Sequence, residues 1–197
     1  MRYHLEPVAS ADVTLPKLAT VPSPNRSSRG GRRPRLVFVH TWGGGTYDGT
    51  VTWLCEKGSN TSAHLVYAGE HGPDAGKCAQ LVPFGDKAWT ECELNAIGIS
   101  VESADAIWQG RDPHGFERLA RIVAGLCHYH LDACRYVTAA GIVAGSHGFT
   151  RHADGGALGC GHLACPTTDG ELWAQFCERV VLEYRRGGFR PSWGADA

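Results

Sequence analysis

The sequence predicts a single mixed α/β domain, and three observations lead to this fold class. Short apolar runs such as "LVFVH" (36–40) and "NAIGISVES" (95–103) are typical of strands buried in a sheet. Two long segments, 111–130 and 168–186, repeat apolar residues at helical spacing. The order of these elements favours a central mixed β-sheet that is flanked by helices.

The strands and their neighbours are predicted from local signals. The run 36–40 ends in His40, as expected of a buried strand that delivers a polar side chain to the sheet edge. A glycine-rich loop and a short helix at 50–57 follow it. The segments "SAHLVYA" (62–68) and "AQLVPFG" (79–85) flank a turn-rich stretch, which predicts two neighbouring strands.

The clearest helix covers 111–130. Asp112 is suited to cap its N-terminus, and Pro113 is suited to its first turn. The helix at 168–186 carries basic residues near its C-terminal end, where they complement the helix dipole. Both helices have one apolar face, which predicts that each packs on the sheet.

The first 34 residues differ in composition from the rest. Their stretch "VPSPNRSSRGGRRPR" is rich in Pro, Ser, Gly and Arg and has no apolar period. We therefore expect an extended leader or linker at 1–34 and the folded domain at 35–190. The arginines either contact phosphate groups or belong to a solvated linker: Arg26, Arg29, Arg32, Arg33 and Arg35.

Charge and cysteine content bound the possible partners and compartment. A net charge of -1 gives no electrostatic reason to expect nucleic acid or an anionic membrane as partner. The start of the chain has no apolar signal region, so we expect the protein to be made and kept in the cytoplasm. We also expect a monomer. The eight cysteines are even in number, but without a signal sequence we expect most to be packing residues, with one or two reserved for a metal.

One segment, 147–169, concentrates potential metal ligands in the sequence "HGFTRHADGGALGCGHLACPTTD". A structural zinc site closes with four protein ligands, whereas a catalytic site uses about three and keeps one position open. The spacing within the segment leaves both kinds of site possible. The candidates are His147, His152, Cys160, His162 and Cys165.

The order of "VFVH", "SAHLVYAGEHG", "NAIGISVE" and "CP" resembles the zinc-dependent N-acetylmuramoyl-L-alanine amidases, a family that includes phage endolysins and peptidoglycan recognition proteins. The resemblance spans roughly 36–185, and the actinobacterial-phage branch is the most similar. It implies the zinc amidase fold, a Zn²⁺ cofactor, bacterial peptidoglycan as substrate, and zinc ligands at His40, His152 and Cys165. His147 is the rival of His152, which fits better because of its separation from "CP" and its following Ala-Asp.

The resemblance also implies a catalytic acid and base. Glu102 keeps the family's separation from Asn95, and a carboxylate on a buried strand needs a partner or a task. Relatives often have Lys or Thr at the position of Leu163, so His162 is assigned here as the oxyanion donor. Further substrate contacts are expected from residues near these motifs, namely Trp42, Tyr47, His64, Trp89 and Asn95. For Trp89, packing in the core is an equal alternative.

The implied reaction is hydrolysis of the amide between N-acetylmuramic acid and L-alanine by zinc-activated water. The resemblance further implies a phage endolysin that stays in the host cytoplasm until a holin releases it to the wall. Three alternatives stay open: a binding module of the same fold without catalysis, a zinc hydrolase of another amide, and a structural zinc protein. The last predicts that the downstream segment keeps its zinc without His40.

Overall fold

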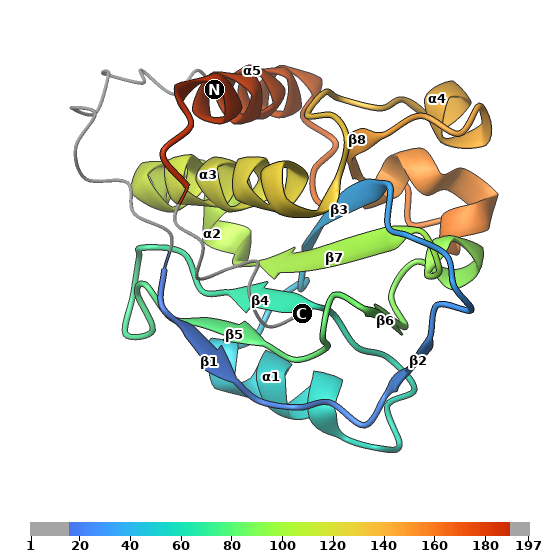
Figure 1. The fold of residues 1–197 in the computed structure, drawn as a ribbon. Helices are drawn as coiled ribbons and strands as arrows, with labels where there is room; N and C mark the ends of the chain where they lie inside the picture. The colour runs from blue at the N-terminus through green and yellow to red at the C-terminus, as the bar shows by residue number, and fades with distance from the viewer. Residues whose placement is uncertain (1–15, 190–197) are drawn as a thin grey trace.

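The computed structural model describes residues 16–189 and contains a six-stranded sheet with strand order β1-β5-β4-β7-β3-β8 (Figure 1). Only β4 and β5 pair antiparallel within it; the other neighbours are parallel. The separate strands β2 and β6 pair antiparallel. The strands are β1 (Leu18–Thr20), β2 (Arg26–Ser28), β3 (Leu36–Thr41), β4 (Leu65–Tyr67), β5 (Cys78–Gln80), β6 (Asp86–Ala88), β7 (Gly98–Ser103) and β8 (Gly148–Arg151).

Helices cover both faces of this sheet (Figure 1). Long helices α3 (Pro113–His130) and α5 (Gly170–Arg186) lie on one face, and α1 (Tyr47–Cys55) lies on the other. Short helical elements connect them: α2 (Asp105–Trp108), α4 (Ala139–Val143), η1 (Cys92–Leu94) and η2 (His152–Gly159). This arrangement confirms the predicted fold class. None of the helices within 16–189 is both long and apolar enough to cross a membrane.

The alternation of β3 separates the core from the polar edge. Val37 and Val39 pack in the apolar cluster beneath α3 and α5, whereas Leu36 and Phe38 pack on the opposite side. Because side chains alternate along a strand, His40 falls on the side of Phe38, away from α3 and α5. The buried apolar residues of the strand therefore fix the position of His40 at the end of β3.

The helix signals in the sequence correspond to real caps. Asp112 accepts a hydrogen bond from Gly115 N at 2.8 Å, and Pro113 is the first residue of α3. Asp169 caps α5 by accepting from the N–H groups of Glu171 and Leu172. Two buried ion pairs, Arg179–Glu117 and Arg121–Glu183, join the two helices.

Residues 18–34 differ from the leader that the sequence predicts. β1 pairs with β5 and completes one edge of the sheet, with Leu18 opposite Cys78. Arg29 is only 5% exposed. A three-residue strand shows no apolar period, so composition alone cannot distinguish it from a linker. The remainder of the predicted leader, 1–15, and residue 190 of the predicted domain lie outside the described residues.

A disulfide between Cys92 and Cys160 joins η1 to the end of η2, across 68 residues of sequence. For these two cysteines the expectation of packing residues or metal ligands is therefore wrong, because their sulfurs are bonded to each other. The other cysteines of the described chain are free: Cys55, Cys78, Cys127, Cys134, Cys165 and Cys177.

Candidate metal centre and active site

Three parallel strands end at the same edge of the sheet and bring their polar ends together. His40 and Glu102 are direct partners in the pairing of β3 with β7. His152 follows β8 immediately, and β8 lies on the other side of β3. Ligands commonly bind at the carboxyl ends of parallel strands, because side chains from several strands converge there.

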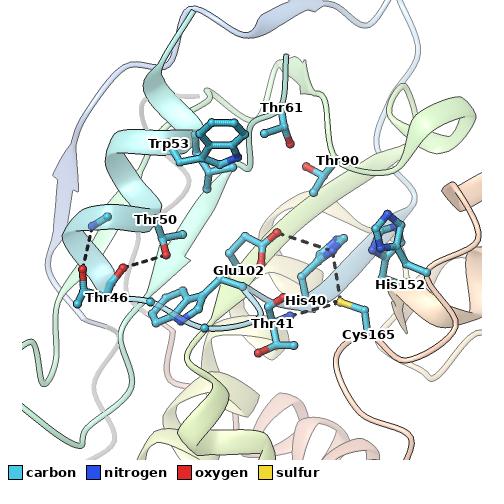
Figure 2. Close-up of a pocket in the computed structure, with 16 residues that line it drawn as sticks. His40, Thr41, Thr46, Thr50, Trp53, Thr61, Thr90, Glu102, His152 and Cys165 are labelled. Atoms are coloured by element: carbon cyan, nitrogen blue, oxygen red, sulfur yellow. Dashed lines mark hydrogen bonds and ion pairs between the residues drawn. The ribbon is translucent and has the colours of Figure 1, made fainter. Parts of the chain in front are cut away.

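His40, His152 and Cys165 form a cluster whose donor atoms all lie within 4.8 Å of one another. The two imidazole rings are 4.4 Å apart between centroids, and Cys165 Sγ lies 3.9 Å from His40 Nδ1. Figure 2 shows the three side chains turned toward one another at one end of a pocket. Two imidazoles and one thiolate suit Zn²⁺ in a site that keeps a coordination position open.

The outer nitrogen of each imidazole is held by a second partner. His40 Nε2 lies 3.1 Å from Glu91 Oε1, and His152 Nε2–H donates to the carbonyl of Gly159 at 2.8 Å. Both contacts leave Nδ1 as the nitrogen that faces the cluster. Such partners fix the ring orientation and the tautomer of metal-binding histidines.

Burial sets the protonation of these donors in the metal-free chain. It lowers the pKa of His40 and brings that of His152 to about 3, so both rings are neutral near pH 7. Burial also raises the pKa of Cys165 to about 12, which keeps its sulfur protonated until a metal displaces the proton. The histidines are therefore ready to bind a cation, and the cysteine has one proton to lose.

Glu102 lies next to the cluster, with Oε1 3.9 Å from His40 Nδ1. Burial raises the pKa of this carboxyl group above its usual value, and the charge of His40 opposes the shift. Its Oε2 is buried without a hydrogen-bond partner among the described residues. A carboxylate with a raised pKa and a free oxygen is suited to accept and return a proton.

The cluster and Glu102 line an open pocket of about 460 Å³. Part of the lining is Thr41 at the end of β3 and the loop after it, with Trp42, Gly44 and Gly45. Helix α1 and its N-cap present Thr46, Thr50 and Trp53, and Glu102 lies between Thr50 and His40 (Figure 2). Trp53 is 55% exposed although it is the largest side-chain type, so its ring is available to a ligand.

The sequence model of the family described as N-acetylmuramoyl-L-alanine amidase matches residues 30–167. The chain belongs to the N-acetylmuramoyl-L-alanine amidase family. The match includes the histidines, the cysteine and the glutamate of the pocket. No curated protein sequence matches the chain.

Solved structures that include a hydrolase and an amidase share the fold. The hydrolase AmiA of Staphylococcus aureus, solved with its ligand, has a TM-score of 0.67 at 15% identity and covers 90% of this chain and 89% of its own. The PlyG catalytic domain has a TM-score of 0.59 at 16% identity, with coverages of 85% and 95%. The amidase LysC of Clostridium intestinale has a TM-score of 0.55 at 14% identity, with coverages of 81% and 97%.

In this amidase-family chain, some of the predicted site residues meet at the pocket. Besides the cluster and Glu102, the pocket contains Trp42 and His162. His162 is exposed and stacks on His152, with 4.6 Å between the ring centroids. His147, the rival of His152, instead pairs with Asp132 at 3.2 Å and is not part of the cluster.

Four residues predicted to contact substrate lie outside the pocket lining of this amidase-family chain. Tyr47 is buried in the apolar cluster beneath α1, and His64 is fully buried against Ser100. Trp89 donates through Nε1 to Ser27. Asn95 accepts hydrogen bonds from the backbone of Thr90 and Glu91. Thr46 and Thr90, which adjoin Tyr47 and Trp89 in the sequence, line the pocket, but the four predicted side chains have other partners.

The sequence does not predict that Glu91 and Trp53 belong to the site. Glu91 is completely buried beside His40, but nothing in "WTEC" indicates that a distant histidine is its partner. Trp53 belongs to a short helix with little apolar periodicity, so the sequence does not predict that its side chain is exposed. The one signal in the sequence is a tryptophan in the element that follows a glycine-rich loop.

Proposed function

We propose that this protein is a zinc-dependent amidase that hydrolyses the amide between N-acetylmuramic acid and L-alanine in bacterial peptidoglycan. The observation that carries the proposal is the convergence of His40, His152 and Cys165 beside Glu102 in an open pocket. A zinc ion held there would supply Lewis-acid polarisation of the scissile carbonyl and activation of water.

The residues of the chain then have separate tasks. Glu102 takes a proton from the attacking water and returns it to the leaving amine of L-alanine, a role that its raised pKa favours. His162 lies at the pocket beside His152 and donates a hydrogen bond to the oxygen on which negative charge develops. Leu163 is 74% exposed and has no polar group for this task.

The pocket walls are suited to a glycopeptide. The indole rings of Trp42 and Trp53 present apolar faces on which sugar rings pack, and the threonine hydroxyls of α1 hydrogen-bond to amides or hydroxyls. The loop of Gly44 and Gly45 brings backbone close to the pocket without side chains. These features support a chain-like substrate that lies across an open site.

The biological setting belongs to the same proposal. We infer a phage endolysin, related to those of actinobacterial phages, that acts as a monomer. It is held in the host cytoplasm until a holin opens the way to the wall. A mutant endolysin from Bacillus subtilis that shares the fold supports this setting, as does the amide for which the family is named.

The experiment combines zinc content by elemental analysis with release of peptides from purified peptidoglycan. Wild type is compared with His40→Ala and with His147→Ala, a matched control from the same ligand-rich segment. We expect about one zinc per chain and new N-terminal alanine from wild type and His147→Ala, and neither from His40→Ala.

Other results identify the alternatives. Zinc retained by His40→Ala would assign the metal a structural role. Zinc in wild type without any release of peptides would contradict the amidase function and favour a binding module. New N-termini other than alanine would show that another amide is the substrate.

A further inference from the structure

A buried arginine lies behind the metal centre. Arg29 precedes the region that matches the family, yet only 5% of it is exposed. Burial of a cation is costly unless its hydrogen bonds and charge are compensated. The guanidinium donates to the backbone carbonyls of Phe84, Asn95, Ala96 and Gly98.

A chain of side-chain contacts connects Arg29 to His40. Arg29 Nη2 lies 2.8 Å from His64 Nε2, and His64 Nδ1 lies 3.0 Å from Ser100 Oγ. Ser100 Oγ also accepts from Thr90 Oγ1 at 3.2 Å, and Thr90 directly precedes Glu91, whose Oε1 lies 3.1 Å from His40 Nε2. This series of contacts thus leads from the guanidinium of Arg29 to the imidazole of His40 in the metal cluster.

A second route passes through the backbone. Arg29 Nη1 binds the carbonyl of Asn95 at 3.2 Å. The side-chain oxygen of Asn95 accepts from Glu91 N at 2.7 Å and from Thr90 N at 3.0 Å. Arg29 therefore holds the backbone that carries Glu91, in addition to the side-chain contacts.

Burial of the guanidinium lowers the pKa of Arg29 to about 10, and the charge of Glu91 is the largest of the effects that oppose this shift. The carbonyls of Phe84, Asn95, Ala96 and Gly98 accept the hydrogen bonds of the guanidinium and offset the cost of its burial.

We propose that Arg29 is a positioning residue of the metal centre, which holds the backbone that carries Glu91 so that Glu91 can fix the ring of His40. The inference rests on the proposed zinc function. It extends the metal site to a residue of the segment that composition assigns to a linker. Arg29 itself touches neither the cluster nor the pocket lining.

The test measures zinc affinity by competition with a chromophoric chelator, and the absorption spectrum of the Co²⁺-substituted protein, which reports thiolate and imidazole coordination. The variants are Arg29→Met, Arg29→Lys, Glu91→Gln and the double variant Arg29→Met/Glu91→Gln. Arg35→Met is the matched control, because Arg35 also donates to backbone carbonyls, those of Ser146 and Ile142. Thermal unfolding of each metal-free variant shows that it is folded.

We expect Arg29→Met and Glu91→Gln each to weaken zinc binding by about 10- to 100-fold and to shift the Co²⁺ spectrum. Arg29→Lys, which keeps the charge, should recover part of the affinity, and Arg35→Met should keep all of it. The loss in the double variant should be smaller than the product of the two single losses, because both act on His40 through one network.

Wild-type affinity and spectrum in folded Arg29→Met would overturn the inference, as would an equal loss in Arg35→Met. If Arg29→Met does not fold, wild-type zinc affinity in folded Glu91→Gln would overturn it. Peptidoglycan cleavage is not part of this readout. A wild type that binds zinc but does not cleave contradicts the proposed function alone, whereas a wild type that binds no zinc contradicts both.

Discussion

His40 and Glu102 are partners in the parallel pairing of β3 with β7, and their side chains meet with 3.9 Å between Nδ1 and Oε1. The pairing fixes a proton acceptor beside a metal donor through the sheet backbone, independently of any loop. Changing one of the two side chains should therefore leave the position of the other intact.

Glu102→Gln removes the proton acceptor and keeps the side-chain size. We expect the variant to keep its zinc and its thermal stability while kcat on peptidoglycan falls by about 10²- to 10⁴-fold. Elemental analysis and turbidity loss of purified walls measure the two quantities. Loss of zinc together with activity would instead make Glu102 a metal ligand.

Zinc binding should release one proton from Cys165. Its pKa of about 12 lies above the working range, whereas His40 and His152 are neutral near pH 7, so only the thiol has a proton to lose. Apparent zinc affinity should therefore rise about tenfold per pH unit between pH 7 and pH 8. Calorimetry at pH 7 in buffers of different ionisation enthalpy counts the proton.

Cys165→Asp is the matched control for that experiment. An aspartate is already ionised at pH 7, so proton release on zinc binding should disappear while binding itself persists. An unchanged proton count in this variant would mean that the proton comes from another group, and the assignment of Cys165 as the donor would be wrong.

Trp53→Ala tests the wall of α1. Because the side chain is 55% exposed, its loss should change the unfolding temperature little. KM for soluble glycopeptide fragments should rise between about 2- and 10-fold with kcat nearly unchanged, since stacking acts on bound substrate and transition state alike. A fall in kcat with constant KM would contradict a binding role.

The Cys92–Cys160 disulfide should stabilise the fold through the chain that it closes. For a separation of 68 residues, the chain-entropy model gives about 4 kcal/mol. Urea unfolding of the double variant Cys92→Ser/Cys160→Ser measures this difference. Cys55→Ser, at a free and partly exposed cysteine, is the control. Equal stability of the double variant and wild type would show that the bond has no such effect.

Local signals were sufficient where a residue's role depends on its own neighbours in sequence. The four apolar residues before His40 predict the strand that carries it. The proline after Asp112 predicts that Asp112 caps the next helix. The long-range resemblance then selected His152 and Cys165, which the structure brings together with His40. Their service as zinc ligands stays a prediction.

The remaining features depend on contacts between distant segments. Nothing near Arg29 in the sequence distinguishes it from the solvated arginines beside it, since its burial depends on carbonyls at 84 and 95–98. His64 sits in a family-like motif but points inward because Ser100 and Arg29 bind it. Partners more than 30 residues away leave no local pattern.

The central position of β3 also has a consequence for synthesis. This strand forms at residues 36–41, but its two neighbours, β7 and β8, begin at Gly98 and Gly148. Contacts so distant in sequence form late and slowly, and β3 has no completed neighbour while the ribosome is still making the first half of the chain. With Cys165 also required, a nascent chain that is shorter than 165 residues lacks a complete cluster. A fragment that ends before that point lacks Cys165, so it should bind zinc more weakly than the full-length chain.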